Sequence, residues 1–82
     1  MEYPEIVSLM KTYVAEATGK DLESIDEKAN FFKLGISSVQ ALKIINKLRK
    51  KLAVDVSPVA MFEFKCISDL STYLSECMAD AA

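Results

Sequence analysis

Two adjacent serines, Ser37 and Ser38, are the side chains in this sequence best placed for chemistry, because they open a helical pattern just after Gly35. A serine nucleophile needs a base beside it and a group that orients that base. The 82-residue chain contains no histidine, and its lysines lie in solvated contexts. It also has no carboxylate pair spaced for acid–base catalysis and no glycine-rich phosphate loop. The sequence therefore predicts no catalytic centre.

A serine at a helix start can still accept a group that another enzyme attaches. The first turn presents unpaired backbone N–H groups and the positive end of the helix dipole. A phosphodiester attached there would lie in a favourable field. Ser38 therefore suits a modification acceptor. The alternative, which physical chemistry alone favours, is that Ser37 and Ser38 only cap the helix.

Composition and charge describe the setting of these serines. At 51% hydrophobic and 27% charged residues, the chain is typical of a globular protein. We expect a single domain over 1–82, with its core at about 4–78. Residues 38–52 hold five bases and no acid, whereas residues 1–37 carry a charge of −3 and residues 53–82 a charge of −4. One basic helix is therefore expected between two acidic flanks.

Apolar spacing and breaker residues predict the elements that position the serines. The first helix should run over about 4–17, with Pro4 in its first turn and Gly19 as its stop. The second should begin at Ser37 or Ser38. A short third helix should begin at the Ser57 cap, with Pro58 in its first position, and run to Phe64. A fourth should follow from about Ile67, with Asp69 in its first turn.

This pattern predicts an all-α fold, a small four-helix bundle of three longer helices and a short third one. The loop over 18–37 is long, and Asn30 could cap a single turn that Gly35 closes. We expect Cys66 and Cys77 to be reduced thiols with no metal role. The inner stripe of the second helix is expected at Val39, Leu42, Ile45, Leu48 and Leu52, flanked by Ala41 and Ile44. The other residues expected to face the core are Val14, Leu70 and Leu74, and in the loop Leu22, Ile25, Phe31, Phe32, Leu34 and Ile36.

The stretch "FFKLGISSVQALKIINKLRKKL" resembles the signature of acyl and peptidyl carrier domains. Phe32, Leu34, Gly35 and Ile36 match that signature, and Ser38 falls on the serine that the family modifies. The resemblance continues through "INKLRKKLAVDVSPVAMFEFKCISDLSTYL". It implies that Ser38 carries a 4′-phosphopantetheine arm from coenzyme A, which holds acyl groups as thioesters. It also implies that the protein is a non-catalytic carrier.

Three departures from the family pattern affect what the resemblance implies. Ser37 replaces the usual aspartate, which could alter recognition by the transferase and leaves a second hydroxyl beside Ser38. Val39 stands where leucine or methionine usually follows. Cys66 replaces a threonine that often caps the last helix, so that helix start is expected to be looser.

Within the carriers, the elements Leu-Gly-Ile-Ser-Ser and Met-Phe-Glu-Phe look most like those of a bacterial modular polyketide synthase. The basic second helix argues against a free-standing fatty-acid carrier, and the abrupt start and short tail suggest a domain cut from a longer synthase. Peptidyl and fatty-acid carriers remain alternatives. The implied partners are a phosphopantetheinyl transferase, a ketosynthase, an acyltransferase and modifying enzymes. The resemblance also implies that the isolated domain is monomeric and cytoplasmic and that it serves antibiotic biosynthesis.

Partners are expected to contact Ser37, Val39, Lys43, Lys47, Met61 and Phe62. The competing interpretations are that the lysines form a solvated face without a partner, that Met61 fills the core, and that Phe62 or Phe64 packs in the core. A rival of another class is a basic-helix adaptor or nucleic-acid-binding bundle, because "KIINKLRKKL" is basic and amphipathic. The net charge of −7 on the remaining residues opposes nucleic-acid binding. No apolar run approaches the roughly 20 residues that span a membrane.

Overall fold

The computed structural model describes the backbone of residues 2–81 and the side chains of residues 2–78. This part of the chain forms four α-helices and one 3-10 turn and contains no strand, which confirms the predicted bundle with a short third helix. A single antiparallel bridge joins Asn30 to Cys66. The elements are α1 (Tyr3–Thr18), η1 (Leu22–Ser24), α2 (Ser38–Leu52), α3 (Ala60–Glu63) and α4 (Ile67–Ala81).

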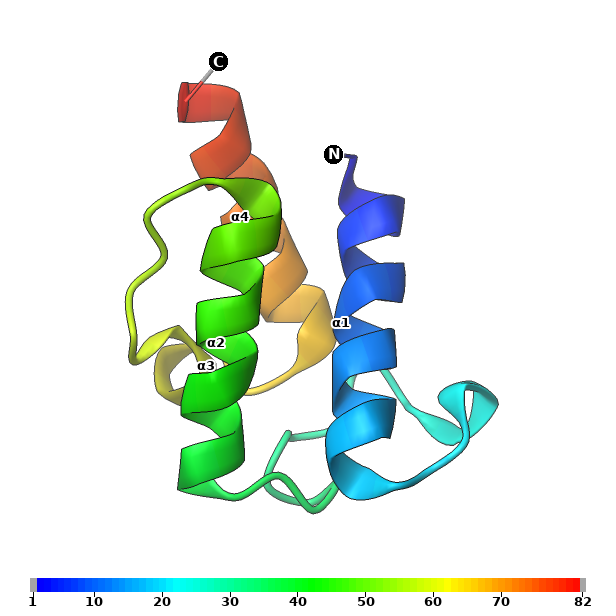
Figure 1. Ribbon diagram of the computed structural model, residues 1–82. Helices are drawn as coiled ribbons and strands as arrows, with labels where there is room; N and C mark the ends of the chain where they lie inside the picture. The colour runs from blue at the N-terminus through cyan, green and yellow to red at the C-terminus, as the bar shows by residue number, and fades with distance from the viewer. Residues whose placement is uncertain (1, 82) are drawn as a thin grey trace.

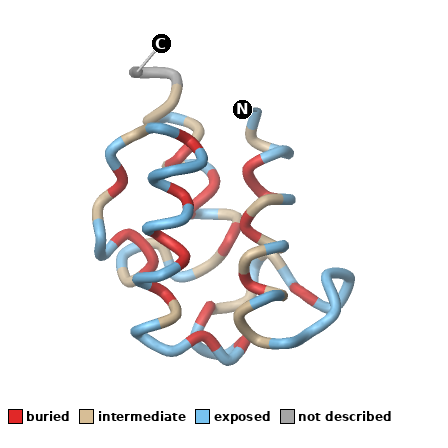
Figure 2. Tube along the Cα trace, in the orientation of Figure 1, coloured by how far each residue is buried: buried red, intermediate tan, exposed pale blue. Residues whose placement is uncertain are grey.

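The long helices α1 and α2 run in opposite directions, so that the end of α1 and the start of α2 lie at the same edge of the bundle (Figure 1). α1 packs chiefly against α4, and the short α3 packs against α2. Buried positions face inward from every long helix and from the loop between α1 and α2 (Figure 2). The largest fully buried side chains include Phe31, Ile6, Met10, Ile45, Leu48, Met61, Ile67, Leu70 and Leu74.

The boundaries of α1 follow the sequence signals. Pro4 lies in the first turn, where its missing N–H would have no helical partner. Gly19 ends the helix in the left-handed conformation, with φ of 71°, and its N–H donates to the Ala15 carbonyl at 2.9 Å. The predicted stop at Gly19 is therefore confirmed.

The inner stripe of α2 differs from the prediction. Val39 is 62% exposed and Leu42 is 44% exposed, whereas Ala41 and Ile44 are buried with Ile45, Leu48 and Leu52. Both sets of residues recur at three- and four-residue spacing, so periodicity alone does not choose between them. Packing against α1 and α3 turns Ala41 and Ile44 inward, and Val39 and Leu42 face outward as a result.

The third helix begins later than predicted. The Ser57 hydroxyl accepts a hydrogen bond from the Val59 N–H at 3.3 Å, and the Ser57 carbonyl accepts one from the Ala60 N–H at 3.0 Å. A serine that bonds the backbone two residues on forms a turn. Pro58 therefore lies in an exposed turn, and α3 starts at Ala60.

The aromatic residues around α3 are part of the core boundary. Phe62 and Phe64 are both half-buried and pack against the core, which supports the interpretation that competes with a partner contact at Phe62. The Phe64 ring stacks on Tyr73 of α4 with 4.7 Å between centroids. A hydrogen bond with the Cys77 thiol raises the pKa of the Tyr73 phenol.

The loop between α1 and α2 is held to the core by only some of its apolar residues. Ile25, Phe31, Leu34 and Ile36 are buried as predicted, whereas Leu22 and Phe32 are 50% and 41% exposed. The Asn30 carboxamide oxygen accepts the Phe32 N–H at 2.8 Å, and Gly35 closes the turn with φ of 103°. The prediction of a turn capped by Asn30 and closed by Gly35 is confirmed.

The start of α4, where Cys66 predicts a looser cap, is hydrogen-bonded to this loop. The Phe31 N–H donates to the Lys65 carbonyl at 2.8 Å, and the Ser68 N–H donates to the Glu27 carbonyl at 2.9 Å. Cys66 and Cys77 are both free thiols. They lie eleven residues apart along α4, or about 16 Å, which is too far for a disulfide.

Candidate modification site at the start of α2

Ser37 and Ser38 have different roles in the structure. Ser37 is the N-cap of α2, since its hydroxyl accepts the Gln40 N–H at 3.2 Å and its own N–H donates to the Gln40 carboxamide oxygen at 2.9 Å. This reciprocal pair is a capping box. Ser38 is the first helical residue and is exposed. Ser37 therefore caps the helix, and the Ser38 hydroxyl is available for modification.

The surroundings of Ser38 suit an attached phosphodiester. The first turn of α2 contains no acidic residue, and the free amides and dipole of a helix start favour an anion. Gly35 lets the chain turn into this helix, because its φ of 103° is strained for any residue with a side chain. The residues present therefore fit a covalently bound phosphopantetheine.

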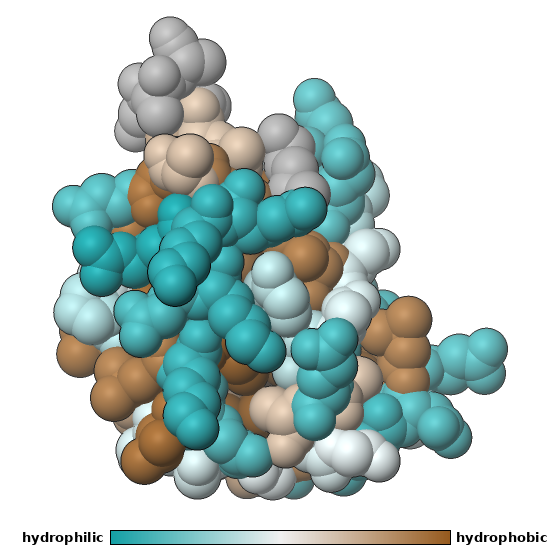
Figure 3. Space-filling view, viewed as in Figure 1, coloured by the Kyte–Doolittle hydropathy of each residue, from teal (hydrophilic) through white to brown (hydrophobic). Residues whose placement is uncertain are grey.

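Apolar side chains surround the site on the α3 side. Val39, Leu42, Val59 and Phe32 are all more than 40% exposed, and the Phe32 ring lies 5.6 Å from that of Phe62. Figure 3 shows apolar surface gathered beside the first half of α2. Val39, Leu42 and Phe32 lie here rather than in the core as predicted, and Val59 carries no prediction. The three-residue spacing of Val39 and Leu42 was the available signal, because it places them on one helix face.

Met61 does not belong to this surface. It is fully buried, so the expected partner contact is wrong and the competing core interpretation is right. A flexible methionine side chain fills irregular gaps between packed elements, and α3 is too short to expose a second apolar row.

The basic residues of α2 divide into two groups. Lys47 lies 3.8 Å from the Glu16 carboxylate and 5.5 Å from the centroid of the Tyr13 ring, both on α1. Arg49 lies 3.4 Å from the Asp55 carboxylate. Within the described residues, Lys43, Lys50 and Lys51 are in none of the ion pairs. The charge available to a partner is therefore smaller than the sequence suggests.

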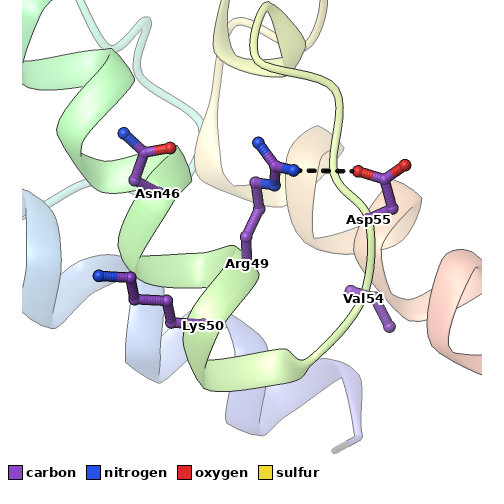
Figure 4. A pocket seen from close by; sticks show the side chains of 5 residues that line it. All are labelled: Asn46, Arg49, Lys50, Val54 and Asp55. Carbon is purple, nitrogen blue, oxygen red and sulfur yellow. Dashed lines mark hydrogen bonds and ion pairs between the residues drawn. The ribbon is translucent and has the colours of Figure 1, made fainter.

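An open hollow lies at the other end of α2. It measures about 790 Å³ and is lined by Asn46, Arg49, Lys50, Val54 and Asp55. Figure 4 shows Arg49 on α2 and Asp55 on the following loop facing each other across it. Arg49 is eleven residues from Ser38, or about 16 Å along the helix. This open hollow is therefore separate from the modification site.

Neither a metal centre nor a membrane segment is found in the part of the chain that the structure describes. No cluster of three potential metal ligands is present there. None of its helices combines the length and the apolar character needed to cross a bilayer.

Comparison with known proteins places this site in a family. Residues 8–74 match the family described as the phosphopantetheine attachment site. The chain is 26% identical over 74 residues to polyketide synthase PksL and 25% identical over 75 residues to polyketide synthase PksM, both of Bacillus subtilis. These alignments cover 90% and 92% of the chain but only 2% of each relative. The chain therefore corresponds to a small segment of these synthases.

Two solved structures share the fold. The HMG-ACPI domain from the CurA module of Lyngbya majuscula has a TM-score of 0.87 at 18% identity, covering 99% of this chain and 83% of that one. A free-standing peptidyl carrier protein from Acinetobacter baumannii has a TM-score of 0.87 at 23% identity, covering 92% and 94%. These similarities confirm the carrier-type helical bundle. Because the family match spans most of the chain, the protein belongs to the phosphopantetheine-binding carrier domains, which hold a covalent cofactor and are not themselves catalysts.

Proposed function

We propose that this domain carries acyl intermediates of polyketide synthesis as thioesters on a 4′-phosphopantetheine arm attached to Ser38. The proposal rests on the different roles of the two serines at the start of α2. Ser37 caps the helix, and Ser38 is exposed in a first turn without acids. The arm supplies the thiol that holds the acyl group, and the protein supplies the anchor and the surfaces that partners recognise.

The attachment site is tested by intact mass after incubation with coenzyme A and a promiscuous phosphopantetheinyl transferase. The parent protein and Ser37→Ala should each gain the mass of one arm, because both retain the Ser38 hydroxyl. Ser38→Ala should gain nothing. A mass gain in Ser38→Ala would show that the anchor lies elsewhere.

The polyketide assignment rests on the relatives. PksL and PksM are polyketide synthases, and the chain corresponds to a small part of each. We infer that residues 1–82 form one carrier unit of such a synthase, served by a ketosynthase, an acyltransferase and modifying enzymes. A peptidyl carrier is the second candidate, since one structural neighbour is a free-standing peptidyl carrier.

The two candidates differ in the enzyme that loads them. The holo protein should accept an acyl group from a polyketide acyltransferase or ketosynthase and should not be aminoacylated by adenylation domains. Intact mass reports either product directly. Aminoacylation at a rate above that of polyketide acyl transfer would favour the peptidyl carrier.

We propose that partners dock beside Ser38 on the face formed by Ser37, Val39, Leu42 and Lys43, with Lys47 and Phe62 at its edges. Exposed charges steer encounter more than they add affinity. Lys43→Glu should therefore slow acyl transfer at low salt, and the defect should shrink as salt screens it. Val39→Ala should slow transfer without that salt dependence, because it removes an apolar contact and adds no charge. Equal rates for Lys43→Glu and the parent at low salt would leave Lys43 as a merely solvated residue.

A further inference from the structure

Gln40 forms three hydrogen bonds at the start of α2. Its backbone N–H donates to the Ser37 hydroxyl at 3.2 Å, and its carboxamide oxygen accepts the Ser37 N–H at 2.9 Å. Its carboxamide NH₂ donates to the Ala17 carbonyl at 2.7 Å, the shortest of the three bonds. The first two bonds close the capping box of α2, and the third crosses to another helix.

Ala17 lies in the last turn of α1. The last four carbonyls of a helix have no partner within it. The Gly19 N–H satisfies the carbonyl of Ala15, and Gln40 satisfies that of Ala17. One side chain therefore closes the end of α1 and the start of α2 together, where the two helices meet at one edge of the bundle (Figure 1).

Most side chains at the start of α2 are exposed. Ser37, Ser38 and Val39 are all exposed, and the first buried residue of the helix is Ala41. A segment with few buried contacts opens more readily than the rest of a structure. The cross-link from Gln40 to Ala17 is the side-chain hydrogen bond that joins this turn to α1, beside the buried contacts of Ile36 before the cap and Ala41 at the end of the turn.

We propose that Gln40 is a positioning residue for modification, which holds the first turn of α2 so that Ser38 meets the phosphopantetheinyl transferase in an ordered helix start. This inference rests on the proposed attachment at Ser38. When only a fraction of the carrier has an ordered first turn, its apparent affinity for the transferase falls by that fraction. The Ser38 hydroxyl itself is unchanged, so the rate of transfer within the complex is unaffected.

Two substitutions separate the cross-link from the cap. Gln40→Glu retains an acceptor for the Ser37 N–H, since glutamate serves a capping box as well as glutamine. An ionised carboxylate has no proton to donate, so the bond to the Ala17 carbonyl is lost. Gln40→Ala removes both. Asn46→Asp is the matched control, because it makes the same amide-to-carboxylate change at an exposed position of α2 that has no bond to α1.

The experiment follows loading of each variant by intact mass over a range of carrier concentrations, with coenzyme A and the transferase. Both Gln40 variants should raise KM about three- to tenfold, the range expected from the loss of one hydrogen bond, with kcat within about twofold of the parent. Asn46→Asp should match the parent. Amide hydrogen exchange, which does not depend on activity, should be faster from Ser38 to Ala41 in Gln40→Glu.

Unchanged KM in both Gln40 variants, with circular dichroism showing them folded, would overturn the inference even if they were less stable. A fall in kcat at constant KM would also overturn it, because that result would place Gln40 in the chemistry. A parent that gains no mass would instead overturn the proposed function, and the inference with it. If the parent loads normally, the proposed function holds, and the Gln40 variants then test the inference alone.

Discussion

The starts of α2 and α4 differ in what their unpaired backbone N–H groups bind. Each leaves backbone N–H groups without helical partners. At α2, the partners come from side chains three residues apart, Ser37 and Gln40. At α4, the Ser68 N–H finds its partner in a distant backbone carbonyl, that of Glu27, and the Phe31 N–H holds the same loop in place by donating to the Lys65 carbonyl. One start is closed locally, and the other is closed by a loop folded over it.

This difference determines which helix start another protein can reach. Because α2 caps itself, nothing needs to cover it, and Ser37, Ser38 and Val39 remain exposed. The loop that closes α4 also covers it, and Ile67 at that start is fully buried. A self-sufficient cap therefore suits a helix start that must enter the active site of a transferase.

The largest expected effect is the loss of Phe31, the residue that holds the loop over the start of α4. Its side chain is fully buried, so Phe31→Ala should lower the free energy of unfolding by about 3–5 kcal/mol. Urea denaturation followed by circular dichroism measures this change. In a domain of this size, such a loss approaches the total stability.

Phe32 is the matched control, because it is the adjacent residue of the same type and is 41% exposed. Phe32→Ala removes only a tilted aromatic contact with Phe62. It should therefore lower the free energy of unfolding by about 0.5–1.5 kcal/mol. Equal losses for the two variants would mean that the loop is not anchored at Phe31.

Ser37→Ala should have a smaller effect on stability, of about 1 kcal/mol, which is typical for the loss of a cap. A change of that size shifts Tm by roughly 4–8 °C in a domain this small, so thermal unfolding can detect it. Ser38→Ala is the control and should leave Tm within about 2 °C of the parent, because Ser38 does not cap. The opposite ranking would assign the cap to Ser38 and remove the basis for a free acceptor hydroxyl.

Features that depend on residues close together in the chain could be predicted from the sequence, and contacts between residues far apart in the chain could not. The helix beginning at Ser37 or Ser38, the stop at Gly19 and the turn from Asn30 to Gly35 all depend on residues within one turn of each other. Gln40, for which no sequence prediction is made, settles which serine caps, because it lies three residues after Ser37 and completes a capping box with it. The bonds from Gln40 to Ala17 and from Ser68 to Glu27 join residues far apart in the chain, and no local pattern encodes them.

Packing decided the remaining differences. Leu42 has the spacing of a core residue, but the outward face of α2 exposes it, whereas Ala41 and Ile44 face inward. Met61, a candidate partner contact with a core position as the competing interpretation, lies in the core because α3 packs it against the bundle. Periodicity gives the existence of an apolar face, and the neighbouring helices determine its direction.

Tyr3 adds a further tie to the start of α4. Its hydroxyl lies 3.2 Å from that of Ser68, so α1 contributes to closing α4 as well. Tyr3→Phe should lower the free energy of unfolding by about 0.5–1 kcal/mol, since the bond is only partly buried. Chemical denaturation measures this, and Tyr13→Phe, which keeps its ring under Lys47, is the control for loss of a tyrosine hydroxyl from α1. A loss as large for Tyr13→Phe would show that the bond to Ser68 contributes nothing specific.

The smallest expected effect is at Cys66, the residue before α4. Threonine there could accept a hydrogen bond from the first turn, as Ser37 does in α2. The gain should nevertheless be small, because the Ser68 N–H is already bound by the Glu27 carbonyl. Cys66→Thr should therefore raise the free energy of unfolding by about 0.5 kcal/mol, at the low end for a cap, and Cys66→Ala should change it by less. Urea midpoints under reducing conditions compare the three proteins. A gain from Cys66→Thr as large as the loss from Ser37→Ala would mean that the loop does not replace a side-chain cap, and the two helix starts would then depend on side chains equally.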